Sequence, residues 1–552
     1  MFHRLQHRGW HYLLLTTVSG ILFFANLGGP TLWDIDEGRN LTCAFEMREA
    51  NNWVVPTFNG KLRPDKPVLL YWLQIIAYEW FGVNEFAGRL PSALAALVTV
   101  LLCYEVARSM FSRPVGLLAG IVVATAPMLS GAAHFANPDG LLNVCVVLTL
   151  ALFWFGYERP TLCWYAALGA AEGLGMLAKG PVAVVIPIGI IAAFLIWERR
   201  WKALIDWRQI AAVFAFIVVA VPWYALVTAE TKGEFAAEFF LKHNRDRVLS
   251  PMENHAGAFW YYPVVLVFGA LPWSIFLVPA LWHGLRSCTR QANAAGADLR
   301  GAAYRLLVCW AVLWIGCFTV AATKLPNYVL PAVAPIAILT AVFLERWRQG
   351  EARLPSWVMP ASLACLAIVG VGLAIGLLVA SGLTPFNVTR GRSFPSLAPW
   401  ALLGIVPIMG SAIAGWFLRN SQRTEMLASV AVSALLLFAP LWAWAIPALN
   451  VHKSPQPLAE LSGANHRHED IRVVTWNVDH LPSLSFYVGR HIEVCASEWQ
   501  VATFLEYPLP VYAFLPAPEW EALQPKLNVP CRELGRHEDL YKRVETVVIT
   551  NR

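Results

Sequence analysis

Apolar runs of about 20 residues recur along most of the chain and are separated by short polar connections. A helix of about that length crosses the hydrocarbon core of a bilayer, so the pattern predicts a polytopic α-helical membrane protein. We count about thirteen transmembrane helices by this criterion. Their predicted limits are 10–28, 85–107, 115–132, 139–157, 161–178, 181–198, 209–228, 259–284, 303–322, 328–345, 357–381, 398–418 and 425–447.

After residue 448 the pattern changes to short runs bounded by polar turns. Residues 471–476 and 484–488 are typical of strands, whereas 498–506 and 519–524 are typical of helices. We therefore predict a transmembrane domain over residues 1–448 and a small soluble α/β domain over residues 449–552. Cys495 and Cys531 both lie in the second domain and are a candidate disulfide pair.

Composition agrees with a membrane protein. Hydrophobic residues make up 57% of the 552 residues and charged residues 14%, whereas soluble proteins carry about 25% charged residues. The 25 Trp residues fit aromatic belts at the two membrane interfaces. The net charge of +6 is accounted for by basic loops and gives no reason to expect a nucleic-acid partner.

Basic residues lie on alternate connections. With the N-terminus inside, the even-numbered connections carry an excess of Arg and Lys, for example Arg199, Arg200 and Lys202, which is the positive-inside pattern of cytoplasmic loops. The loop over residues 29–84 and everything after Ala448 are then expected on the opposite side, where nucleotides are absent. Within that loop, residues 68–81 are apolar but short, which is typical of an interfacial helix.

Unusual polar residues gather in the connections expected on that opposite side. Three carboxylates in four positions beside a bilayer are costly unless they have a function, and Asp36 is the acid of this group that we expect to act, rather than Asp34. The candidate site residues are Asp36, Glu37, Arg39, Asp65 and Lys66 in the first loop, Asp139, Lys179, and Lys324 with Tyr328 in later loops, and His243 and His255 in the connection over 230–257.

A carboxylate pair with several cations at one membrane face suits transfer between phosphorylated substrates. The cations stabilise charge that develops on a phosphate leaving group, and a carboxylate acts as a general base or holds a cationic part of the substrate. Because nucleotides are absent on this side, a lipid-linked phosphate sugar is the natural donor. Asp65, His243 and His255 are weak candidates for a divalent metal, since two His twelve residues apart form an incomplete ligand pattern.

Structural explanations exist for the same residues. An interfacial Lys or Arg often anchors a helix end, as Lys179 and Lys324 beside proline would do. Asp139 is placed to cap the following helix, and Asp65 to form a turn. A transporter is a further alternative, but transporters favour charges near mid-membrane and repeated halves, whereas here the charges gather at one face and no repeat is visible.

The motifs together resemble bacterial membrane glycosyltransferases of the GT-C fold, and among them the transferases that add 4-amino-4-deoxy-L-arabinose to lipid A. The resemblance rests on Asp36-Glu37-Gly38-Arg39, residues 53–60, Asp65-Lys66-Pro67, Asn137-Pro138-Asp139, residues 177–181 and residues 324–331. The first-loop motif is shared with protein O-mannosyltransferases, so a related transferase that acts on protein or another glycan is the alternative function.

The resemblance implies a multi-pass enzyme of the bacterial inner membrane with its active site and C-terminal domain in the periplasm. It would take the aminosugar from undecaprenyl phosphate, with inversion, and place it on a lipid A phosphate, which would weaken binding of polymyxin and other cationic peptides. Asp36 and Asp139 match the family's acidic positions, and Arg39, Lys66 and Tyr328 match its donor-phosphate or site-lining positions. One departure is Arg63-Pro64-Asp65, where the family often has an aromatic residue and Glu before Lys-Pro.

Overall fold

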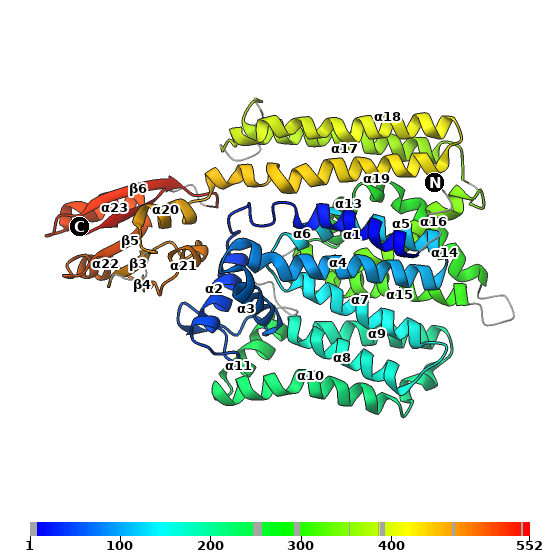
Figure 1. Ribbon diagram of the computed structural model, residues 1–552, viewed down its shortest axis with the longest axis horizontal. Helices are drawn as coiled ribbons and strands as arrows, with labels where there is room; N and C mark the ends of the chain where they lie inside the picture. The colour runs from blue at the N-terminus through cyan, green and yellow to red at the C-terminus, as the bar shows by residue number, and fades with distance from the viewer. Residues whose placement is uncertain are drawn as a thin grey trace.

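The long apolar runs form a helical bundle, and the C-terminal segment forms a sheet domain at one end of it (Figure 1). The structure is a computed structural model and describes residues 8–246, 257–291, 299–352, 354–384, 386, 392–465, 470–541 and 545–552. The bundle elements are α1 (Arg8–Phe24), α4 (Glu85–Met110), α5 (Arg113–Ala124), α6 (Pro127–Ala133), α7 (Asp139–Gly156), α8 (Leu162–Lys179), α9 (Val182–Trp197), η2 (Trp201–Ile205), α10 (Gln209–Glu230), α11 (Glu234–Ala237), η3 (Glu238–Asp246), α13 (Tyr261–Gly269), η4 (Trp273–Phe276), α14 (Leu277–Gln291), α15 (Leu299–Val320), η5 (Pro326–Ala332), α16 (Val333–Arg348), α17 (Val358–Ser381), η6 (Pro395–Gly404), α18 (Ile405–Arg419), α19 (Arg423–Pro440), η7 (Leu441–Ala445) and η8 (Pro447–His452).

The prediction of a polytopic helical membrane protein is confirmed at the level of eight to ten spans. Among the described residues, eight helices are long and apolar enough to cross a membrane, or ten if each of two bent helix pairs is one span. The other three predicted spans correspond to α1, α8 and α9, which have 17, 18 and 16 residues. A proline lies at each of the two bends. Helices α5 and α6 meet at 61° at Pro127, and α13 meets the segment Trp273–Cys288 at 116° beside Pro272.

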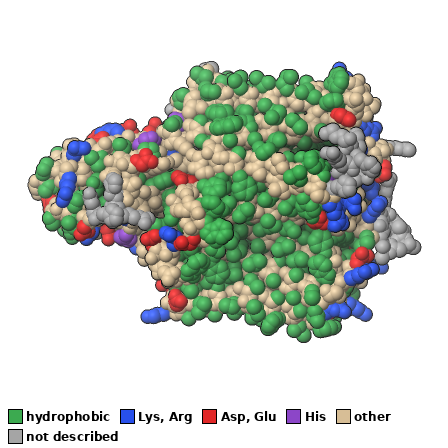
Figure 2. Space-filling model, in the orientation of Figure 1, with side chains coloured by type: hydrophobic (Ala, Val, Ile, Leu, Met, Phe, Trp, Pro, Cys, Tyr) green, Lys and Arg blue, Asp and Glu red, His purple; other side chains and the backbone are tan. Residues whose placement is uncertain are grey.

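Burial differs strongly between the helices. In the most apolar 18-residue window of Pro326–Arg348, 94% of the residues are buried, which places this segment at the centre of the bundle, whereas in that of Val358–Ser381 only 17% are buried. The exposed residues of Val358–Ser381 are apolar, for example Ile368 and Ile375. Figure 2 shows hydrophobic side chains over the surface of the bundle, with charged side chains gathered on the sheet domain and at the opposite end. An apolar belt of this kind is what a lipid-facing surface requires.

The first connection, residues 29–84, folds against the end of the bundle that faces the sheet domain (Figure 1). It contains α2 (Asp36–Glu49), a hairpin of β1 (Thr57–Phe58) and β2 (Lys61–Leu62), and α3 (Leu69–Phe81). Helix α3 coincides with the predicted interfacial segment over 68–81. Asn84 then caps α4 by accepting a hydrogen bond from the Ala87 amide.

The C-terminal segment is a mixed α/β domain, as predicted. Its sheet has the order β4-β3-β5-β7-β6, with β3 parallel to β4 and β5, and β7 antiparallel to β5 and β6. The elements are α20 (Pro455–Ser462), β3 (Arg472–Trp476), α21 (Ser483–Val488), β4 (Glu493–Cys495), α22 (Glu498–Leu505), β5 (Val511–Pro516), α23 (Ala517–Leu523), η9 (Gln524–Lys526), β6 (Arg532–Glu538) and β7 (Glu545–Thr550).

Two predictions in this domain were wrong. Residues 484–488 form the short helix α21 instead of a strand, because the run begins after Pro482 and ends at Gly489 in the left-handed conformation. Cys495 and Cys531 are both free. They cannot be bridged, because Cys495 ends β4 at one edge of the sheet and Cys531 precedes β6 at the other edge.

Candidate functional site

A cavity of about 820 Å³ lies at the end of the bundle next to the sheet domain. Asp36 and Asp139 both line it, although they come from different connections. The first loop contributes Trp33 and Asp34, η5 contributes Asn327, and apolar walls come from α6, α13 and η7. The structure therefore brings the two predicted acids to one cavity, as expected of a site for a polar reacting group with an apolar carrier.

Asp139 is held by residues from two other elements. It is the first residue of α7, where the positive end of the helix favours a carboxylate. Lys179 Nζ, from the last turn of α8, forms an ion pair with Asp139 Oδ1, and Asn327 Nδ2 donates to Asp139 Oδ2 at 2.5 Å. The Lys179 ammonium also lies 4.9 Å from the ring centroid of Tyr328. Asp139, Lys179 and Tyr328 thus form one cluster, as the sequence suggested.

Asp36 begins α2 and reaches the same cavity from the other side. Asn137 Nδ2 donates to Asp36 Oδ2 at 3.3 Å, so the residue two positions before Asp139 links the two acids. Arg39 lies three residues further along α2, which places it on the same helix face as Asp36. Asn137 is the side-chain hydrogen-bond partner of Asp36 within the described part of the chain, and Asp36 is partly exposed, so its carboxylate is available to a substrate.

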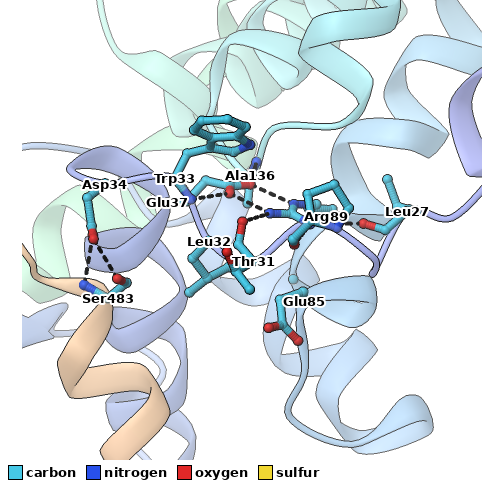
Figure 3. A network of polar contacts seen from close by, with 12 residues as sticks. Leu27, Thr31, Leu32, Trp33, Asp34, Glu37, Glu85, Arg89, Ala136 and Ser483 are labelled. Atoms are coloured by element: carbon cyan, nitrogen blue, oxygen red, sulfur yellow. Dashed lines mark hydrogen bonds and ion pairs between the residues drawn. The ribbon is translucent and has the colours of Figure 1, made fainter. Parts of the chain in front are cut away.

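Glu37 is fully buried with Arg89 of α4 (Figure 3). Arg89 donates to both carboxylate oxygens, from Nε at 2.8 Å and from Nη2 at 2.7 Å. The same oxygens accept the backbone amides of Trp33 and Ala136 at 2.9 and 2.8 Å. Glu37 therefore ties the loop before Asp36 to the loop before Asp139. This geometry favours a structural role over the predicted contact with substrate.

Lys324 also has a structural environment. It is 7% exposed, and its ammonium donates to the carbonyl oxygens of Thr319 at 2.6 Å and Ala321 at 3.1 Å. These carbonyls belong to the C-terminal end of α15 and the residues that follow it, where a cation is favoured. The structure thus places Lys324 on a helix terminus instead of in the Asp139 cluster. Lys66 lies between β2 and α3 and is partly exposed.

Two of the three metal candidates, Asp65 and His243, lie in contact. Asp65 Oδ1 lies 3.1 Å from His243 Nε2 and joins the first loop to η3, while His255 lies outside the described residues. No group of three or more His, Cys, Asp or Glu side chains that could hold a metal ion occurs among the described residues.

The sheet domain contacts the first loop through Asp34, which the sequence analysis left without a role (Figure 3). The Ser483 amide and hydroxyl donate to Asp34 at 2.8 and 2.6 Å, and the Tyr541 hydroxyl accepts the Asp34 amide at 2.9 Å. Burial raises the pKa of Asp34 from 3.8 to about 7, although the hydrogen bonds from Ser483 act in the opposite direction. Asp34 thus joins the first loop to the sheet domain at the lining of the cavity.

Lys453 completes this contact. Its ammonium donates to the Thr31 carbonyl at 2.8 Å and lies 3.3 Å from the ring centroid of Trp33. Burial lowers the pKa of Lys453 from 10.5 to about 7, against the attraction of Glu37. The connection into the sheet domain therefore contacts the segment directly before Asp36.

Sequence reasoning missed Arg89, Asn327 and the role of Asp34. Arg89 carried a usable signal, because an arginine inside an apolar span is rare and calls for a buried partner. Asn327 and Asp34 carried none, since a short polar side chain in a loop is common and the partner of Asp34 is 449 residues away.

Comparisons with known proteins show similarity to membrane glycosyltransferases. The sequence profile of the dolichyl-phosphate-mannose-protein mannosyltransferase family matches residues 65–224. The undecaprenyl phosphate-alpha-4-amino-4-deoxy-L-arabinose arabinosyl transferase of Pseudomonas aeruginosa (strain UCBPP-PA14) is 29% identical over 434 residues, 73% of this chain and 76% of that protein. The protein of the same name from Edwardsiella ictaluri is 32% identical over 343 residues, 61% of this chain and 60% of that protein.

The fold extends the similarity to nearly the whole chain. The crystal structure of ArnT from Cupriavidus metallidurans bound to undecaprenyl phosphate superposes with a TM-score of 0.82 at 24% identity, covering 99% of this chain and 98% of that chain. The chain thus has the fold of that crystal structure and is similar in sequence to membrane arabinosyl transferases.

Proposed function

We propose that this glycosyltransferase moves 4-amino-4-deoxy-L-arabinose from undecaprenyl phosphate to a phosphate of lipid A. The observation that carries the proposal is the cavity shared by Asp36 and Asp139, with Lys179 paired to the second acid. Relatives that carry this activity in their names align over most of the chain. Loss of a lipid A phosphate charge would give resistance to polymyxin and other cationic antimicrobial peptides.

The reaction would be a single displacement with inversion at the anomeric carbon. A lipid A phosphate oxygen attacks that carbon as the bond to the undecaprenyl phosphate oxygen breaks, and the leaving phosphate takes the electron pair. The acceptor phosphate is already largely anionic at neutral pH, so deprotonation is not the main difficulty. We assign Asp36 to orienting the acceptor or the ammonium of the aminosugar. Arg39 and Lys66 would stabilise the departing phosphate.

The Asp139 cluster would bind the other side of the reacting centre. Its carboxylate is fixed by Lys179 and Asn327. Tyr328, next to the Lys179 ammonium, would line the donor end of the site. Such preorganised charges need no rearrangement as charge develops in the transition state.

The proposal also includes an orientation of the chain in the membrane. The thirteen predicted helices would all cross the inner membrane, α1, α8 and α9 included, with the N-terminus in the cytoplasm. The cavity and the domain over residues 449–552 would lie in the periplasm, and residues 1–448 would form the catalytic transmembrane domain. Figure 2 supports this orientation, because Lys and Arg side chains gather at the end of the bundle opposite the sheet domain.

The test is mass spectrometry of lipid A from cells that carry the wild-type protein or variants at matched expression. Asp36→Asn and Lys66→Ala should each lower the amount of aminoarabinose-modified lipid A by about 10²–10³, if they act like other charge-stabilising contacts. Glu49→Gln on α2 and Lys61→Ala on β2 are exposed controls in the same loop and should retain activity. Near-normal modification by both site variants would refute the site.

The same experiment separates the alternative function. A related transferase that acts on protein or another glycan would leave lipid A unchanged, and the sugar would appear on a glycoprotein in cells with the wild-type chain only. The family profile, named for protein mannosyltransferases, is the observation that favours this second candidate. An added lipid A mass equal to one aminoarabinose distinguishes the two outcomes.

A further inference from the structure

A second cavity, of about 650 Å³, lies between α7, α8, α9 and α10 and shares no lining residue with the first. Its mouth carries Glu158 and Arg200, at the end of the bundle opposite Asp139. Helix α7 separates the two ends, and its 18 residues span about 27 Å. The walls are mainly apolar and aromatic, with Phe153, Trp164, Tyr165, Leu168 and Phe216 among them.

The cavity contains one buried acid. Glu172 of α8 is 6% exposed and lines the cavity, and its Oε1 has no hydrogen-bond partner among the described residues. Other buried or half-buried acids of the bundle are paired: Glu105 with Arg108, Glu198 with Arg305 and Glu345 with Arg348. A carboxyl group in apolar surroundings without a partner is costly and marks a functional position in a membrane protein.

We propose that this cavity binds a hydrophobic primary amine, whose ammonium group pairs with Glu172. An ammonium would supply the donor that the Glu172 oxygen lacks, in a charge-assisted hydrogen bond. The aromatic walls suit both halves of such a ligand, because ring faces attract a cation and ring edges pack against an apolar body. The volume lies within the range of small-molecule sites.

The depth of Glu172 excludes a phospholipid headgroup as its partner. Glu172 is ten residues into α8, about 15 Å along the helix from its first residue. A phospholipid headgroup stays at the interface, where it would meet Glu158 and Arg200 instead. Access from the bilayer is open to a compact amine, because Ile188 and Val213 line the cavity and are 47% and 56% exposed on the apolar outer surface.

The test uses the full-length protein in nanodiscs of phosphatidylcholine, a lipid that contains no primary amine. The probe is tritiated 1-aminoadamantane, and its neutral counterpart 1-adamantanol serves as a competitor. Wild-type protein should bind the amine saturably above empty nanodiscs. Glu172→Gln should weaken binding roughly 10- to 100-fold, the size of a hydrogen bond to a charged group. Glu158→Gln at the mouth should bind like the wild type, and the alcohol should not compete.

Three results would overturn the proposal: unchanged binding by Glu172→Gln, loss of binding in Glu158→Gln alone, or equal competition by the alcohol. The second result would place the amine at the mouth, as a lipid headgroup would be. Should Glu172→Gln fail to fold, Val213→Trp fills the cavity from its exposed side and should abolish saturable binding. Binding that survives Val213→Trp would equally refute the site, and no arm depends on transferase activity.

Discussion

At the scale of single residues, the Asp139–Lys179 pair allows one prediction about stability and one about activity. Lys179 and Asp139 are both largely buried, with side chains 13% and 5% exposed. Lys179→Met would leave the carboxylate with Asn327 as its remaining side-chain partner, which should lower the free energy of unfolding by about 3 kcal/mol. If Asp139 acts on substrate, lipid A modification should fall about 100-fold. Thermal unfolding in detergent and lipid A mass spectrometry measure the two effects; Lys179→Arg, which keeps the charge, should recover part of each.

The buried pair of Glu37 and Arg89 gives a contrasting prediction at the same scale. Glu37 accepts four hydrogen bonds and has no exposed surface. Glu37→Gln should remove the charge that compensates Arg89 and lower stability by about 3–5 kcal/mol. The expected result is loss of folded protein from membranes, measured by size-exclusion chromatography after extraction, while Asp36→Asn at the cavity should extract normally. Folded but inactive Glu37→Gln protein would instead point to the substrate contact first predicted.

At the scale of elements, Gly38 on α2 sets how closely the sheet domain approaches. A Cβ at Gly38 would lie 2.7 Å from the Cα of Ser483 and even nearer to its backbone nitrogen. Because backbone atoms cannot move aside easily, Gly38→Ala should push α21 away from α2 and break the Ser483 hydrogen bonds to Asp34. Hydrogen exchange over residues 34–40 and 483–488 should become faster. Gly20→Ala on α1, where a Cβ meets nothing within 4 Å, is the control.

The elements also show which structural features a sequence predicts well. Apolar runs located the long helices, and the short apolar run over 68–81 located α3, because hydrophobic length is a local property. The sequence placed α5 and α6 in one straight span, although Pro127 bends them, since proline inside a membrane helix is often tolerated. Residues 484–488 failed as a strand because five apolar residues fit a buried helix equally well.

At the scale of the whole molecule, the sequence predicted which loops share a face but not how they are joined. Loop parity and charge brought Asp36, Asp139 and Lys179 to one end of the bundle. The sequence could not show that Glu37 is buried whereas Asp36 lines the cavity. Adjacent residues on a helix point in different directions, and the burial of Glu37 depends on Arg89, 52 residues away. Nor could it pair Asp34 with Ser483, since hydrophobic pattern carries no information about contacts across 449 residues.

The contact between the domains predicts a dependence on pH. Asp34 has a pKa of about 7 in the folded protein, above its ordinary 3.8, so the folded state binds more protons between these values. Stability from this group should therefore fall as pH rises from about 4 to 7. Lys453 has a pKa of about 7, below its ordinary 10.5, so the folded state binds fewer protons and stability should rise from pH 7 to 10.

The two contributions together predict a minimum near pH 7 in the stability of the docked sheet domain. Asp539, Glu37 and Arg89 also act on these groups, so the measurement is a difference between the wild type and each variant. Unfolding temperature in detergent, recorded from pH 4 to 10, should show that Asp34→Asn removes the slope below pH 7 and Lys453→Met the slope above it. Differences that stay constant with pH would mean that neither group titrates through this contact. A difference that slopes only below pH 7 for Asp34→Asn and only above pH 7 for Lys453→Met would instead identify Asp34 and Lys453 as the pair that couples the sheet domain to the loop presenting Asp36.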